Sequence, residues 1–410
     1  MKEKHNKINR RNFLKTIGAA GVGSVFVSAK TIAGPDEPKA TGKTQEPKFP
    51  QVPRRKLGKT GVEVSCLALG TIFNVLEKQI LLRKSLEWGV TYWDTAHGYT
   101  NGNSELGIGK FLEKNPEVRK KLFIVSKASD AETPAEIEKR LQTSLKRMNT
   151  KYIDLYYGVH VLDDPSQLTN ELKKWAESAK KRKLIRFFGF SAHGNMAECL
   201  TAAAKVGWID AVMPSYNFRL MQDDKMQAAV EACHKAGVGL IAMKTQGRRL
   251  RSKEDKKLAE HFLQRGFTEG QAKVKIVLED ERISSACVGR DNLEHLQLNI
   301  AAVLDKTKLT KADAEVFKKY AQDTCSGYCA GCGHICNSAL PDTPYVSNIM
   351  RYLMYYNSYG EHAAARELFA QIPHNVRDRL LSTDYSPAEA HCPQHLPIAE
   401  LVAEAVSKLA

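Results

Sequence analysis

Between about residues 60 and 300, short apolar segments alternate with segments whose apolar residues recur at helical spacing. The eight apolar segments are 65–71, 91–96, 122–128, 153–160, 185–193, 210–217, 239–245 and 285–290. Continuous apolar runs are typical of strands buried on both faces, and helical connections pair such strands in parallel. Eight units of this kind predict an α/β fold, a (β/α)8 TIM barrel. An open doubly wound sheet is the alternative, but "ALGTIFN" after the first run lacks the G-x-G-x-x-G turn.

The segment "TPAEIEKRLQTSLKRM" illustrates the helical pattern. Thr133 precedes Pro134 and stands three residues before Glu136, which predicts an N-cap with a capping box and proline in the first turn. The apolar residues that follow, from Ile137 to Met148, fall on one face of a helix. We expect this helix to cover the barrel.

The first residues have the features of an export signal. "NRRNFLK" resembles the twin-arginine motif, and "TIGAAGVGSVFVSA" after it is uncharged and ends in small residues. We therefore expect a signal peptide over 1–29, export to the periplasm by the twin-arginine route, and a linker over 30–52. A basic amphipathic start on a cytoplasmic protein is the alternative. The uncharged stretch is too short for a stable membrane span.

The formal charge of the 410-residue chain is +15, and part of it lies in the basic head of the signal. The remaining basic residues are scattered, with short clusters at 180–183 and 247–253. No aromatic residues are interleaved with them and no recognition-helix motif is present, so we expect no nucleic-acid partner.

Titratable residues stand where the predicted strands end, which is where a barrel places its chemistry. Asp94, Lys127 and His160 close three successive strands, and Tyr99 follows Asp94 in the next loop. A lysine cation beside a tyrosine lowers its pKa, an aspartate keeps that lysine oriented, and a histidine donates a hydrogen bond to a carbonyl. The set suits protonation of an oxygen while hydride reaches the carbon.

Several motifs in residues 53–305 resemble the aldo-keto reductase family. They include "GVTYWDTAHGYTNGNSELGIGKFL", "FIVSKA", "YIDLYYGVH", "RFFGFSAHGN" and "VGRDNLEHLQLNI". The resemblance implies a TIM barrel, a nicotinamide cofactor and interconversion of a carbonyl and an alcohol on a small molecule, a sugar being one candidate. It also implies that Tyr99 is the proton donor, Lys127 its activator, Asp94 the partner of the lysine and His160 the residue that orients the substrate.

The same resemblance assigns cofactor-binding positions. They are Gly70, Thr71, Ser191, Gly289, Arg290 and Asn299. Four positions depart from the family pattern, because Ala192, Met243, His295 and Leu298 replace the usual asparagine, tyrosine, arginine and glutamate. The resemblance therefore implies NADP or NAD without choosing between them.

The tail, residues 306–410, contains a cluster of cysteines and two helical patterns. Cys329, Cys332 and Cys336 form a C-x2-C-x3-C group, and Cys392 stands before a proline much later. Iron–sulfur segments use such spacings, four thiolates also bind zinc, and disulfides form outside the cytoplasm. The tail is similar to the ferredoxin-like extension of one aldo-keto reductase branch, which implies a [4Fe-4S] cluster on these four residues, with zinc as the alternative.

Together these features predict an exported oxidoreductase that carries a tightly held nicotinamide and a cluster, with a small-molecule substrate and a possible redox partner. The alternative function is a non-catalytic or electron-transfer barrel with a structural metal site and no exchangeable nicotinamide.

Overall fold

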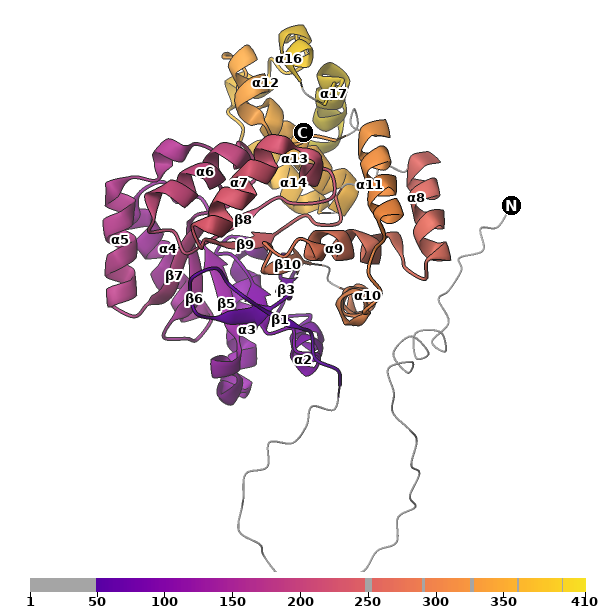
Figure 1. Cartoon of the computed structure of the whole chain (residues 1–410). Coiled ribbons are helices and arrows are strands. Elements are labelled where there is room, and N and C mark those ends of the chain that lie inside the picture. Colours follow the sequence, from indigo (N-terminus) through magenta and orange to yellow (C-terminus); the bar gives the residue numbers. More distant parts are fainter. Residues whose placement is uncertain (1–48, 248–252, 290–291, 325–327, 360, 393) are drawn as a thin grey trace, which may run out of the picture. The chain divides into compact units, whose positions relative to one another are not determined.

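The fold is taken from a computed structural model, which describes residues 49–247, 253–289, 292–324, 328–359, 361–392 and 394–410 (Figure 1). Within these residues no helix is long and apolar enough to cross a bilayer. The predicted signal peptide and most of the linker lie outside the described residues.

Eight parallel strands form a closed barrel, so the predicted fold class is confirmed. In chain order they are β3 (Leu67–Gly70), β4 (Tyr92–Asp94), β5 (Phe123–Lys127), β6 (Ile153–Val159), β7 (Ile185–Ala192), β8 (Ala211–Pro214), β9 (Gly239–Ala242) and β10 (Ser285–Val288). Each lies within one of the eight apolar segments, and β10 pairs with β3 to close the barrel.

A short antiparallel hairpin precedes the barrel, made of β1 (Arg54–Lys56) and β2 (Glu63–Ser65). Leu57 and Val64 from this hairpin are fully buried in the same core as residues of the barrel strands. Lys59 N–H donates to Gly237 O, just before β9 begins. The hairpin therefore packs at the amino ends of the strands and leaves the carboxyl ends for function.

Helices follow the strands around the outside of the barrel (Figure 1). They are α2 (Gln79–Glu87), α3 (Asn103–Lys114), α4 (Pro134–Arg147), α5 (Asn170–Lys181), α6 (Met196–Val206), α7 (Asp224–Lys235), α8 (Lys253–Gln264), α9 (Glu269–Glu279) and α10 (Leu293–Leu304). The capping box predicted for α4 is present, with the Thr133 side chain accepting from Glu136 N–H. Ile137, Leu141 and Met148 are buried, as their spacing predicts.

Further helices form the tail. They are α11 (Lys311–Asp323), α12 (Gly333–Ala339), α13 (Val346–Met354), a π-helical turn (Tyr355–Tyr359), α14 (His362–Ala370), α15 (His374–Arg377), α16 (Ser386–His391) and α17 (Ile398–Leu409). In α11, Phe317 stacks on Phe262 of α8 with ring centroids 4.7 Å apart, so α11 packs on the barrel. The helices after α11 bury a separate hydrophobic core between Leu340 and Leu409.

Candidate active site

A buried ion pair joins the ends of two neighbouring strands. Lys127, at the end of β5, places Nζ 2.5 Å from Asp94 Oδ1 at the end of β4. The same ammonium donates to Thr95 O at 2.7 Å. Both side chains are almost fully buried. The carboxylate and the carbonyl together hold the cation in one place inside the barrel, where an unpaired charge would be costly.

Tyr99 lies beside this pair, on a 3-10 turn (Tyr99–Gly102) that follows β4. Lys127 Nζ is 4.9 Å from the centroid of the tyrosine ring. Burial raises the pKa of Tyr99 well above its ordinary value, and the charge of Asp94 raises it further. Burial therefore outweighs the lowering expected from the neighbouring Lys127 cation, and the net shift of this pKa is upward. A raised pKa keeps the phenol protonated, as a proton donor must be.

His160 faces Tyr99 across the site, with ring centroids 6.0 Å apart. Burial lowers the pKa of His160 to about 3, helped by the positive charges of Lys127 and Arg351, so the imidazole is neutral.

Ser129 is placed to select the tautomer of that imidazole. Ser129 Oγ accepts from Gly98 N–H at 3.0 Å and lies 3.0 Å from His160 Nδ1. A hydroxyl has one proton and two acceptor lone pairs, so Ser129 can donate to Nδ1 while it accepts from Gly98 N–H, and we assign this arrangement. The imidazole proton is then on Nε2, and His160 can donate to a substrate oxygen.

The structure also shows where the predicted cofactor residues lie. Thr71 Oγ1 donates to Asp94 O at 2.8 Å, and Ser191 Oγ donates to His160 O at 3.2 Å. Gly289 packs so closely on Gly70 that a Cβ on Gly289 would be 2.8 Å from Gly70 O. These four residues thus surround the carboxyl ends of β3, β4, β7 and β10. Asn299, on α10, is farther along the chain, and its side chain accepts from Gln246 Nε2 at 2.9 Å. Arg290 lies outside the described residues.

Two buried polar atoms in the loops after β7 and β9 have no hydrogen-bond partner. They are His193 Nδ1 and Thr245 Oγ1. Buried polar atoms are normally satisfied, so these two leave room for a water or a polar ligand at this edge of the barrel. Their position near Ser191 is compatible with the nicotinamide that the sequence resemblance implies.

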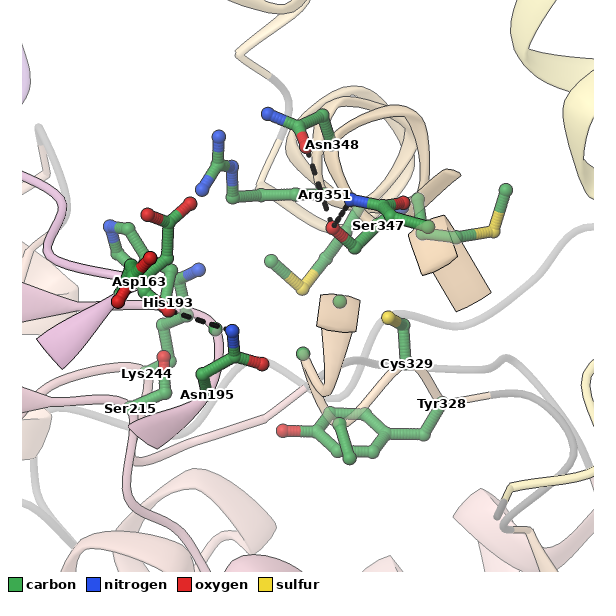
Figure 2. A pocket seen from close by; sticks show the side chains of 18 residues that line it. Asp163, His193, Asn195, Ser215, Lys244, Tyr328, Cys329, Ser347, Asn348 and Arg351 are labelled. Atoms are coloured by element: carbon green, nitrogen blue, oxygen red, sulfur yellow. Dashed lines mark hydrogen bonds between the residues drawn. The ribbon is translucent and has the colours of Figure 1, made fainter. Parts of the chain in front are cut away.

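A cavity of about 200 Å³ lies between these strand ends and the tail (Figure 2). The barrel contributes Asp163, Asp164, His193, Ser215 and Lys244, and the tail contributes Tyr328, Cys329, Ser347, Asn348 and Arg351 among others. Figure 2 shows Arg351 reaching from the helix on one side of the cavity, with Lys244 and His193 on the other.

Direct contacts hold the tail in this position. Asn195 N–H donates to Gly331 O at 3.1 Å, and Asn217 Nδ2 donates to the Tyr328 hydroxyl at 3.0 Å. Gly331 has a φ of +83°, and a Cβ there would be 2.2 Å from His193 O. The cysteine-bearing loop therefore covers the mouth of the barrel above β7 and β8.

The four predicted metal ligands lie around a second, smaller cavity of about 20 Å³. Cys329, Cys332, Cys336 and Cys392 are all free thiols, and burial raises the pKa of the first three to about 11. Across the described residues, no group of three or more His, Cys, Asp or Glu side chains is arranged to hold a metal ion. Cys329 lines both cavities, so this cysteine group adjoins the candidate active site.

Four residues of the site were not predicted from the sequence. Ser129 stands two residues after Lys127, and Lys244 follows Met243 at the end of β9. Both positions follow from the rule that chemistry gathers at strand ends, so the sequence could have revealed them. Arg351 and Tyr355 come from the tail, and no local signal connects them with the barrel. Tyr355 lies near enough to Tyr99 to raise its pKa and places its ring 5.3 Å from Lys244 Nζ.

Comparison with known proteins agrees with this arrangement. The Aldo/keto reductase family matches residues 70–321. L-glyceraldehyde 3-phosphate reductase of Escherichia coli strain K12 is 26% identical over 328 residues, which is 66% of this chain and 92% of that protein. The enzyme of the same name from strain O157:H7 is 25% identical over 323 residues, with the same coverage.

Among solved structures, an aldo-keto reductase from Bacillus halodurans in its holo form superposes with a TM-score of 0.55 and 20% identity, over 66% of this chain and 96% of that one. That likeness shows the fold. Because the family match extends over more than half of the sequence, the chain belongs to the aldo/keto reductase family and is an NAD(P)-dependent oxidoreductase with extra helices at its carboxyl end.

Proposed function

We propose that the protein reduces the carbonyl of a small molecule to an alcohol, with Asp94, Tyr99, Lys127 and His160 as its catalytic residues. The single observation that carries this proposal is the meeting of a protonated Tyr99 and a neutral His160 beside the buried Lys127–Asp94 pair. The E. coli relatives are named as reductases, and at about a quarter identity we take from them only the reaction class.

Each residue has a defined part in this reaction. His160 Nε2–H and the Tyr99 hydroxyl converge on the carbonyl oxygen, and Tyr99 transfers its proton as negative charge develops there. Lys127 then stabilises the resulting phenolate, and Asp94 keeps Lys127 in place. A bound nicotinamide supplies the hydride to the carbonyl carbon. Ser191, whose hydroxyl donates to His160 O, is the residue we assign to hold the nicotinamide edge. We assign the rest of the cofactor to Gly70, Thr71, Gly289, Arg290 and Asn299.

Kinetics test the proposal. The wild-type protein should oxidise NADPH or NADH when a small aldehyde is added, and Tyr99→Phe should lose about 10²- to 10⁴-fold in kcat. Tyr345→Phe, which removes a tail hydroxyl away from the tetrad, is the control. Equal turnover by wild type and Tyr99→Phe would show that Tyr99 is not the proton donor. No aldehyde reduction by the wild-type protein would support the alternative function, a barrel that binds without catalysing, which the substitutions Ala192, Met243 and Leu298 favour.

We also propose that Cys329, Cys332, Cys336 and Cys392 hold a [4Fe-4S] cluster. Four thiols around one cavity supply the donor set that such a cluster requires. Its position beside the larger cavity suggests that the cluster fixes the tail over the barrel mouth, and a redox partner is the further possibility.

Zinc is the second candidate for this site, because of the size of the cavity. A volume of about 20 Å³ holds about one water, and a single ion bound by four thiolates needs no more space. A four-iron core requires the sulfurs to move apart. Iron, sulfide and zinc analysis of the purified protein with its visible spectrum distinguishes the two: a broad absorption near 400 nm with iron and sulfide supports the cluster, and zinc alone refutes it.

Finally, we propose that the twin-arginine segment exports the folded protein to the periplasm. That route carries proteins with their cofactors already bound, which suits both the cysteine site and a nicotinamide that cannot be exchanged outside the cytoplasm. Fractionation of producing cells tests this: the protein and bound nicotinamide should be found in the periplasm, and Arg10→Lys with Arg11→Lys should retain the protein in the cytoplasm. Cytoplasmic wild-type protein, or purified periplasmic protein without nicotinamide, would contradict it.

A further inference from the structure

The cavity between barrel and tail contains two basic side chains that form no ion pair within the described residues. Lys244 approaches from the end of β9 and Arg351 from α13, and both are half-buried. In the described part of the chain neither makes an ion pair or a side-chain hydrogen bond. Their partners are aromatic: Lys244 Nζ lies 5.3 Å from the Tyr355 ring centroid, and Arg351 Cζ lies 5.4 Å from that of Tyr352. Cations enclosed in this way ordinarily have an anionic partner.

The backbone near both basic residues has conformations that are uncommon and are found at functional sites. Lys244 has a φ of +56°, a left-handed conformation that is strained for a side chain with a Cβ and that recurs at ligand sites. Arg351 stands one helical turn before Tyr355, where α13 changes to a π-helical turn, and such turns are frequent at functional sites. His193 adds a buried Nδ1 without a partner on the wall of the same cavity.

Two carboxylates also line this cavity, Asp163 and Asp164, and both are exposed. Neither forms an ion pair with Lys244 or Arg351 in the described residues. Asp163 is near enough to Arg351 for that positive charge to offset part of the rise that burial causes in its pKa, but neither carboxylate is within ion-pair distance of the two basic groups, which leaves both available to a ligand.

The cavity adjoins the catalytic residues. Arg351 is near enough to His160 to lower the pKa of that histidine. Tyr355 is near enough to Tyr99 to raise its pKa, and its ring centroid lies 5.3 Å from Lys244 Nζ. A small molecule whose carbonyl lies between Tyr99 and His160 would extend its other end toward Lys244 and Arg351.

We propose that this cavity binds an anionic group of the substrate, a carboxylate or a phosphate, with Lys244 and Arg351 as its ligands. The substrate class is then a small carbonyl compound with a negative charge at the end remote from its carbonyl. The inference rests on the proposed carbonyl reduction. Because Arg351 belongs to the tail, the tail completes the substrate site and helps to set which substrates bind.

Matched substrates test the proposal on the full-length protein with its metal content verified. Succinic semialdehyde is the anionic probe and butanal is the neutral one of the same chain length. Arg351→Gln and Lys244→Met should each lower the ratio of kcat/KM for succinic semialdehyde to that for butanal by at least tenfold. Arg366→Gln, an exposed arginine of the same tail outside the cavity, should leave the ratio within twofold. A ratio that stays the same in both cavity variants would overturn the proposal.

Direct binding separates the possible causes. In isothermal titration, succinate should bind the wild-type protein at least tenfold more tightly than the Arg351→Gln, Lys244→Met double variant, whereas equal binding or no binding overturns the proposal. If instead the variants weaken NADPH binding tenfold and preserve the substrate ratio, the anion is the cofactor diphosphate and the proposal is wrong. If succinate binding is lost in the variants but no aldehyde is reduced by wild type, the anion site stands and the proposed reaction falls.

Discussion

Replacing Ser129 by alanine tests how His160 is prepared to donate a hydrogen bond. The change removes one hydrogen bond of 3.0 Å to His160 Nδ1 and so releases the imidazole to adopt either tautomer. A hydrogen bond of this kind contributes about 1 kcal/mol net, which corresponds to about a fivefold loss in kcat/KM. The loss should lie mainly in kcat, because donation to the oxygen strengthens as charge develops on it.

The assay is oxidation of NADPH at a fixed pH near 7 with one aldehyde, measured in a double-mutant cycle with His160→Ala. If Ser129 acts through the imidazole, Ser129→Ala should cost less than twofold once His160 is absent. Ser178→Ala, on the exposed face of α5, is the control for a surface serine. The same fivefold loss in the His160→Ala background would refute this reasoning. It would show that Ser129 acts instead through its hydrogen bond with Gly98 N–H, beside Tyr99.

Three further predictions concern stability. Gly331→Ala should lower the free energy of unfolding by about 1–3 kcal/mol more than Gly207→Ala and should reduce the metal content. Both glycines have positive φ, but of the two only Gly331 lacks space for a Cβ. Equal losses of stability in denaturant titrations would contradict this. The pKa of His160 is about 3 in the folded protein and about 6.5 in the unfolded chain, so the free energy of unfolding should fall as the pH drops below 6.5, by about 2 kcal/mol at pH 5. His160→Asn should remove that part of the pH dependence. An unchanged pH dependence would argue against a buried neutral imidazole. Asp94→Asn should destabilise the protein by about 3 kcal/mol because it leaves Lys127 buried without a counter-ion, and a melting temperature equal to that of wild type would show that the pair carries no charge.

Most of the barrel could be predicted because its signals are local. Apolar runs bounded by polar segments identify the eight strands, and Thr133 with Glu136 identifies the start of α4. The meeting of Asp94 with Lys127 also follows from topology, since the carboxyl ends of neighbouring parallel strands lie at one edge of the barrel.

The remainder depends on tertiary packing that the sequence does not encode locally. The pKa of Tyr99 is raised because the side chain is buried, and burial of a loop residue cannot be read from its neighbours in the chain. Arg351 reaches the site only because the tail docks on β7 and β8 through Gly331 and Tyr328. The spacing of the cysteines predicted that four thiols would meet, but not that one of them, Cys329, would line the larger cavity as well.

Transfer of a labelled hydride tests the central claim most directly. Purified protein would be mixed with NADPH carrying deuterium at C4 and with a small aldehyde, and the alcohol would be analysed by mass spectrometry and NMR. The account predicts that the deuterium appears on the former carbonyl carbon with wild-type protein and that Tyr99→Phe slows its appearance by at least a hundredfold. The account would be contradicted if the alcohol contained no deuterium when either C4 position of NADPH was labelled in turn. It would also be contradicted if Tyr99→Phe transferred the label at the same rate as the wild-type protein.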